Sequence, residues 1–183
     1  MSRRRYRAPA APGAILGGLF LLLVAWRIWQ ETNRTENLPS TLDERQYDVE
    51  RVIDGDTLLL ANRARVRLIG VDTPETVKPE HPVEPWGPEA TQFTRAFVAA
   101  GRVRLQFDKE RFDRYDRFLA YVWVEDRMLN EELVRAGLAR VELAYNYSPA
   151  MKTRFRRAEA AAQAAHRGIW SVAAGQLVTP VRD

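Results

Sequence analysis

Residues 47–71 read YDVERVIDGDTLLLANRARVRLIGV. The stretch holds three short runs rich in apolar and β-branched residues, at 47–53, 57–61 and 64–71. An Asp-Gly pair separates the first two runs and an Asn-Arg pair separates the last two, and such pairs favour tight turns. Short runs joined by tight turns predict three strands of an antiparallel meander.

The following residues predict two more strands and three helices. Proline is favoured in the first turn of a helix and asparagine at the N-cap, so these residues mark the expected helix starts. The strands are expected at 103–107 and 118–124, and the helices from Gly87-Pro88 onward, from Asn130 through Leu138, and from Ser148-Pro149 to Gly168. Strands that come first and helices that come mostly later predict the α+β class.

Arg67 is the charged residue that draws attention within the third run. Period-two alternation places Val66 and Leu68 on one face and Arg65 and Arg67 on the other, so Arg67 is expected to point away from the core. A strand arginine of this kind is ordinarily only a solvated charge. Here, acidic clusters flank it on both sides, which favours a phosphate-binding role.

The two acidic clusters are Asp54-Gly-Asp56-Thr57 and Asp72-Thr73-Pro74-Glu75, and a second arginine, Arg117, stands in the run DRYDR at 113–117. Taken alone, Asp-Gly-Asp is typical of a β-turn. Carboxylates next to arginines, however, suit a site that holds a hard cation against a phosphate while water is activated beside it.

Four segments of the chain resemble one known family in order and spacing. They are residues 52–57 (VIDGDT), 67–76 (RLIGVDTPET), 86–90 (WGPEA) and 113–117 (DRYDR). Together they resemble the staphylococcal nuclease (thermonuclease) family over about Tyr47 to Trp170. The resemblance implies a five-stranded OB-type β-barrel with three α-helices, and a calcium-dependent phosphodiesterase that cuts DNA and RNA.

The resemblance also implies a set of metal ligands. Asp56 and Asp72 match carboxylate ligands of Ca²⁺, and the backbone carbonyl of Thr73 matches a third protein ligand. Asp54 lies close in sequence and is expected in the outer coordination sphere. Water and a substrate phosphate oxygen would complete the coordination.

Catalytic roles follow from the same resemblance. Glu75 matches the residue that activates or orients the attacking water, and the sequence leaves open which of the two it does. Arg67 and Arg117 would bind the phosphate and stabilise the charge that builds on its oxygens. The implied reaction breaks the bond to the 5′ oxygen and leaves 3′-phosphate products.

Nucleotide-binding residues are implied as well. Tyr115, Tyr145 and Tyr147 match positions that stack on or hydrogen-bond to the nucleotide, and Arg114 is placed to contact a terminal phosphate. The segment 141–149 is two residues longer than the family pattern, which is expected to displace one of the later tyrosines.

Asp116 and Phe118 replace glycines that the family pattern has on either side of Arg117. Aspartate tolerates the left-handed backbone conformation that glycine adopts easily. A phenylalanine at this place is expected to narrow the site or to alter substrate access.

Composition narrows the class of site. The chain has 183 residues, 46% of them apolar, which is enough for one well-buried core. It has no cysteine and only two histidines, His81 and His166, so a metal site in it would use oxygen ligands. Arg3, Arg4, Arg5 and Arg7 alone carry +4, which equals the net charge of the chain. Residues 46–172 carry 20 basic and 19 acidic side chains, so overall charge does not indicate nucleic-acid binding.

The N-terminus predicts a membrane segment. Residues 8–26 carry no charge and follow the arginine cluster, and their length approaches that of a membrane-spanning helix. We expect a cytoplasmic basic stub and signal-anchor helix at 1–29, a linker at 30–46, the nuclease domain at 47–172 and a tail at 173–183. The domain would face the periplasm or exterior as part of a single-pass protein of the cytoplasmic membrane, and secretion after signal cleavage is the alternative.

The predicted partners are DNA and RNA, single strands preferred, bound by a monomer. Two other classes stay open at this stage. One is a catalytically weak OB-type module that binds single-stranded nucleic acid at the membrane, and the other is a membrane-tethered scaffold.

Overall fold

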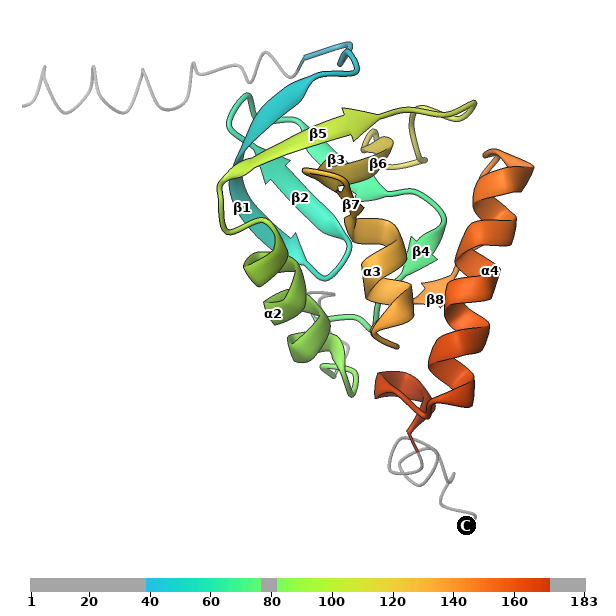
Figure 1. Ribbon diagram of the computed structural model, residues 1–183. Helices are drawn as coiled ribbons and strands as arrows, with labels where there is room; N and C mark the ends of the chain where they lie inside the picture. Colours follow the sequence, from blue (N-terminus) through green and yellow to red (C-terminus); the bar gives the residue numbers. More distant parts are fainter. Residues whose placement is uncertain (1–38, 77–81, 172–183) are drawn as a thin grey trace, which may run out of the picture. The chain divides into compact units, whose positions relative to one another are not determined.

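A computed structural model describes residues 39–76 and 82–171 (Figure 1). Its strands are β1 (Gln46–Asp54), β2 (Thr57–Leu60), β3 (Arg65–Leu68), β4 (Val71–Asp72), β5 (Arg102–Gln106), β6 (Phe118–Val124), β7 (Arg127–Met128) and β8 (Arg140–Val141). Its helices are α2 (Gly87–Phe97), α3 (Leu129–Arg135) and α4 (Pro149–Ala164), followed by the short 3-10 helix η1 (Gly168–Trp170).

The long strands form a closed barrel. Antiparallel pairs join β3, β2, β1, β5 and β6 in that order, and β3 then pairs with β6 in parallel. This last pairing sets Val66 opposite Phe118 and Arg67 opposite Leu119, and it closes the ring of five strands. The short β7 extends the sheet beside β6, and β4 pairs with β8 in a separate ribbon. The predicted α+β class, with five barrel strands and three helices, is confirmed.

The alternation predicted for the third run decides which side chains enter the barrel. Val66 and Leu68 are fully buried in the core, and Arg65 is exposed on the other face. Arg67 shares that outer face, yet it is only 6% exposed, because carboxylates and neighbouring loops enclose it. The helix α4 covers one side of the core through Phe155 and two alanines of the same stripe, Ala158 and Ala162.

Asn130 does not cap α3 as predicted. The helix begins at Leu129, and Asn130 lies buried in its first turn. Its side-chain amide donates to the carbonyl oxygens of Ile69 (2.9 Å) and Ala120 (3.2 Å), and its Oδ1 accepts from the Val122 N–H (2.9 Å). These bonds connect α3 to the region where β3 pairs with β6 and closes the barrel. One partner, Ile69, is far from Asn130 in the sequence, so only the tertiary structure reveals this role.

The predicted boundaries differ by a few residues. The helix α3 ends at Arg135 instead of Leu138, and α4 ends at Ala164, so that Gly168 lies in η1. At the start of the domain, Leu42 is 3% exposed and packs in the core, although it lies within the predicted linker. Burial therefore begins before Tyr47.

The predicted N-terminal membrane helix and the C-terminal tail lie outside the described residues. Within residues 39–76 and 82–171, no helix is long and apolar enough to cross a membrane. The described part of the chain is the barrel with its helices, and it carries the site.

Candidate active site

A polar cleft of about 920 Å³ opens on the outer face of the barrel. Its walls come from the β1–β2 turn, from β3, from the loop after β4, from the loop before β6 and from the segment after β8. The lining residues are Ile53, Asp54, Asp56, Thr57, Arg65, Arg67, Asp72, Thr73, Pro74, Glu75, Glu110, Asp113, Arg114, Tyr115, Arg117, Glu142, Ala144 and Tyr145. Every predicted site residue except Tyr147 is among them.

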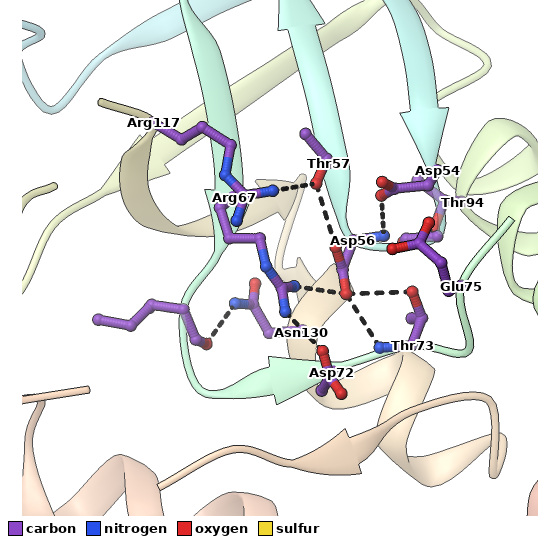
Figure 2. Close-up of polar contacts among 12 residues, drawn as sticks. Asp54, Asp56, Thr57, Arg67, Asp72, Thr73, Glu75, Thr94, Arg117 and Asn130 are labelled. Carbon is purple, nitrogen blue, oxygen red and sulfur yellow. Dashed lines mark hydrogen bonds and ion pairs between the residues drawn. The ribbon is translucent and has the colours of Figure 1, made fainter. Parts of the chain in front are cut away.

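The centre of the cleft is a buried cluster around Asp56. Its Oδ2 accepts from the Thr73 N–H (2.9 Å) and the Thr73 hydroxyl (3.0 Å) and pairs with Arg67 Nη1. The other Arg67 nitrogen, Nη2, lies 2.8 Å from Asp72 Oδ1. Arg67 therefore bridges one carboxylate from each of the two acidic clusters (Figure 2).

The β1–β2 turn holds Asp54 beside this cluster. The Asp54 carboxylate accepts from the Asp56 N–H (3.1 Å), as in an Asx turn, and the Thr94 hydroxyl of α2 donates to the Gly55 carbonyl (2.6 Å). A Cβ at Gly55 would lie 2.7 Å from the Thr73 hydroxyl, so only glycine permits this close approach. The turn is thereby fixed against both α2 and the loop after β4.

Negative charge is crowded in this part of the cleft. Burial, followed by repulsion from Asp56, raises the pKa of Asp54 to about 7. Burial also raises the pKa of Asp72, against the opposing effect of Arg67. Burial alone would lower the pKa of Arg67, but Asp56 and Asp72 outweigh it and raise that pKa. The site thus favours an additional positive charge near its carboxylates.

Arg117 enters the cleft from the loop before β6. Its Nε donates to Asp113 Oδ2 (2.6 Å) and its Nη1 to the Thr57 hydroxyl (3.4 Å), which in turn donates to Asp56 Oδ1 (3.1 Å). Figure 2 shows Arg67 and Arg117 directed at the neighbouring residues Asp56 and Thr57. Two guanidinium groups therefore converge on one acidic patch, although 50 positions separate them in the chain.

Asp113 holds the loop that carries Arg117. Besides Arg117 Nε, its carboxylate accepts from the backbone N–H groups of Tyr115 (2.8 Å) and Arg117 (3.0 Å). Burial alone would raise the pKa of Asp113. The hydrogen bonds from Arg117 and Tyr115 outweigh it and lower that pKa below its ordinary value. Asp116 adopts φ 57°, the left-handed conformation expected where the family has glycine.

Glu75 lies on the loop after β4, and its backbone is fixed by Glu84. The Glu75 N–H donates to Glu84 Oε2 (3.2 Å), and the Glu84 N–H donates to the Glu75 carbonyl (2.9 Å). The Glu75 carboxylate accepts from the Thr76 N–H (3.0 Å). The loop therefore holds a carboxylate at the rim of the cleft that contains both arginines.

Comparisons with known proteins agree with this geometry. Residues 65–172 match the family described as staphylococcal nuclease homologues. The thermonuclease of Staphylococcus hyicus is 41% identical over 166 residues, which span 86% of this chain and 98% of that protein. The chain belongs to the staphylococcal nuclease family. It is a nuclease.

Two further relatives have the same kind of name. The thermonuclease of Staphylococcus intermedius is 48% identical over 129 residues, covering 68% of this chain and 75% of the relative. Endonuclease YncB of Bacillus subtilis is 37% identical over 152 residues, covering 78% and 71%. These names favour a nuclease over the binding module and the scaffold that the sequence had left open.

The aromatic residues predicted to bind nucleotide divide into two groups in this nuclease. Tyr115 is 56% exposed and lies at the mouth of the cleft, where Arg114 Nη2 donates to its hydroxyl (2.7 Å). The guanidinium groups of Arg114 and Arg117 lie 4.8 and 5.4 Å from the centre of its ring. Tyr145 also lines the cleft, and burial raises the pKa of its hydroxyl.

Tyr147 does not reach the cleft. It is 2% exposed, its ring packs against Phe155, and its hydroxyl donates to the Glu142 carbonyl (2.8 Å). Gly70 adopts φ +79° beside this ring, and a Cβ there would lie 2.8 Å from it. The predicted displacement of one tyrosine thus concerns Tyr147, which belongs to the core of the nuclease.

Phe118 does not narrow the site as expected. It begins β6, is 3% exposed and packs against Phe107 and Phe112. Alternation along the strand sends its ring into the barrel, while Arg117 beside it faces the cleft.

Several cleft residues had no predicted role. The spacing of Asp113 and Arg117, four residues apart with opposite charges, was an available signal for the pair. Glu110, Glu142 and Arg65 also line the cleft, and nothing in their local sequence marked them. Tertiary structure alone brings these charges to the nuclease site.

The metal ligands predicted for the nuclease lie together in the cleft. Within the described residues, no group of three or more acidic or histidine side chains is arranged to hold a metal ion. Arg67 pairs with both Asp56 and Asp72. The donors are all oxygens, and the Asp72 side chain is 58% exposed and thus able to turn. Oxygen donors of this kind are the ligands that a hard cation such as Ca²⁺ prefers, so the donor set fits that ion.

Proposed function

We propose that this nuclease is a calcium-dependent phosphodiesterase that hydrolyses DNA and RNA to 3′-phosphate products. The convergence of Arg67 and Arg117 on the Asp56–Thr57 pair supports this proposal most directly. Two guanidinium groups that approach one point suit a phosphate with charge on several oxygens.

Asp56, Asp72 and the Thr73 carbonyl would hold the Ca²⁺ ion, with Asp54 in its outer coordination sphere. The bound ion would polarise the phosphate and supply the positive charge that these carboxylates lack. With the ion held there, Arg67 would be able to turn its guanidinium from Asp56 and Asp72 to the phosphate.

Glu75 orients the attacking water and accepts its proton as the oxygen of the water bonds to phosphorus. Arg67 and Arg117 donate to the equatorial oxygens of the phosphate, and Arg117 assists departure of the 5′ oxygen. Tyr115 and Tyr145 bind the nucleotide beside the cleft, and Arg114 binds a further phosphate. Single strands suit this open cleft, because their bases are accessible for stacking on the tyrosines.

The catalytic part of the proposal is tested with Arg67→Ala, Arg117→Ala and Glu75→Gln. Each removes a group that acts in the transition state, and each is expected to lower kcat by about 10²–10³-fold on single-stranded DNA and RNA. Arg102→Ala is the matched control, since Arg102 is an exposed strand arginine outside the cleft. Parental turnover in all three folded variants would place the chemistry elsewhere.

The metal part has two readouts. Cleavage is expected to stop in chelator and to return with added calcium. Calcium is also expected to raise the Tm of the parent, because a ligand that binds the native state stabilises it. Asp56→Asn should remove that shift. Cleavage that continues undiminished in chelator would exclude the calcium site.

We also propose that the nuclease domain is attached to the outer face of the cytoplasmic membrane, acting there as a monomer. The uncharged span at 8–26 behind four arginines supports this. Protease treatment of intact cells should release the domain, whereas a soluble product with its N-terminus near Trp26 would show signal cleavage instead.

A further inference from the structure

Arg65 lines the cleft but has no part in the proposed chemistry. Strand pairing sets it opposite Leu59 of β2, and Leu59 is in turn opposite Arg51 of β1. Residues paired in this way project from the same face of a sheet. Arg51, Leu59 and Arg65 therefore form one row across the three strands.

This row lies beside the one that carries the proposed phosphate site. Thr57 of β2 is paired with Arg67 of β3. Thr57 lies two positions before Leu59, and Arg67 lies two positions after Arg65. Two positions along a strand cover roughly 6.6 Å on the same face. The row Arg51–Leu59–Arg65 thus continues the outer face of the barrel away from Arg67 by about one nucleotide.

The middle of the row is apolar and shielded. Leu59 points outward and does not belong to the core cluster, yet only 8% of it is exposed. Arginine stems cover apolar surface while their guanidinium groups stay in water. Arg51 and Arg65 stand on either side of Leu59, so their aliphatic stems have an apolar side chain to pack on. This packing restricts the positions of their two guanidinium groups.

Arg51 and Arg65 differ from the two arginines at the centre of the cleft. Arg67 and Arg117 are held by carboxylates. Among residues 39–76 and 82–171, neither Arg51 nor Arg65 forms an ion pair, and both are exposed. Their charges are available to a ligand from solution without the loss of an internal contact.

We propose that Arg51 and Arg65 bind phosphates of a polynucleotide that neighbour the one being cleaved. The inference rests on the proposed function, in that it takes the reacting phosphate to lie between Arg67 and Arg117. Guanidinium groups bind phosphate through charge and paired N–H donors, without regard to base sequence. The row makes the enzyme prefer long strands to dinucleotides.

The test compares Arg51→Ala/Arg65→Ala with the parent on long oligothymidylate and on the dinucleotide TpT. Arg156→Ala/Arg157→Ala is the matched control, because it also removes two exposed positive charges but lies on α4 outside the cleft. For oligothymidylate, KM should rise several-fold with kcat unchanged. The slope of log KM against log salt concentration should become shallower by about 0.7 for each lost phosphate contact. For TpT, neither KM nor kcat should change.

Two results would overturn the inference. In the first, the Arg51→Ala/Arg65→Ala variant has the same KM for oligothymidylate and the same salt slope as the control variant. The other is an equal rise in KM for both substrates, since this would place Arg65 at the cleaved phosphate instead of its neighbour. Cleavage that persists in chelator would reject the calcium proposal but leave this comparison of two substrates valid.

Discussion

Asp113→Asn is the substitution that best separates the position of Arg117 from its charge. The asparagine Oδ1 still accepts from the backbone N–H groups of Tyr115 and Arg117. Its amide nitrogen, however, replaces the oxygen that lies 2.6 Å from Arg117 Nε, so that two donors face each other. Arg117 keeps its charge but loses the group that orients it.

The size of the effect follows from this one contact. The side chain of Asp113 is 2% exposed, so the lost bond is a buried, charge-assisted one, worth about 1.5–3 kcal/mol. That free energy corresponds to roughly 10–100-fold in the population of correctly placed Arg117. We expect kcat on oligothymidylate to fall by that factor, and the free energy of unfolding in urea to fall by a similar number of kcal/mol.

Asp116→Asn is the matched control. It removes the same charge three residues away, and asparagine tolerates the φ of 57° at that position. Its turnover should stay close to the parental value. If Asp113→Asn and Asp116→Asn had equal kcat and equal stability, Asp113 would not be the residue that orients Arg117.

Acid should remove the difference in stability between Asp113→Asn and the parent. The folded-state pKa of Asp113 is lower than that of the unfolded chain, so its contribution is fully present above the ordinary aspartate pKa of about 3.9. The contribution is lost as the pH falls through the lower, folded-state pKa. Urea unfolding at a series of pH values should therefore show the parent and the variant converging in acid.

Three further substitutions test the core. Asn130→Ala leaves the Val122 N–H and the Ile69 carbonyl without Asn130, whereas the Ala120 carbonyl still accepts from the Ile69 N–H, and it should lower the free energy of unfolding in urea by about 2 kcal/mol. An unchanged value would contradict the tie to the closing strands. Gly70→Ala should lower Tm more than Gly101→Ala, since both have positive φ but only Gly70 faces a ring at 2.8 Å. Tyr147→Phe should cost about 1 kcal/mol of stability and leave KM unchanged, whereas a raised KM would show that Tyr147 contacts substrate.

Local patterns predicted the strands because the alternation of apolar and polar residues is a property of each strand by itself. Val66 and Leu68 entered the core as expected, and Gly87-Pro88 opened α2. The parallel pairing of β3 with β6 has no local signal, since it depends on how the whole sheet curls. The closed barrel was therefore expected from family resemblance alone.

Residues with two common uses were the ones that sequence patterns misplaced. Asparagine favours helix caps, but Asn130 lies inside α3 and bonds to buried backbone groups of β6 and of Ile69. Tyrosine suits nucleotide stacking, but Tyr147 fills the space beside Gly70. Asp113 is a different case, because it stands in the DRYDR run that was predicted to belong to the site. Its hydrogen bond to Arg117 depends on the geometry of the loop, which the spacing of the two residues does not determine.

The parallel pairing of β3 with β6 also determines when the two site arginines come together during folding. It sets Arg67 opposite Leu119, with Arg117 just ahead of β6, so the two arginines meet only when these distant segments join. Pairing between segments so far apart in the chain carries a loop-closure cost. Until that cost is met, the acidic clusters and Arg67 lack Arg117 beside them, so the site is assembled by the same step that closes the barrel.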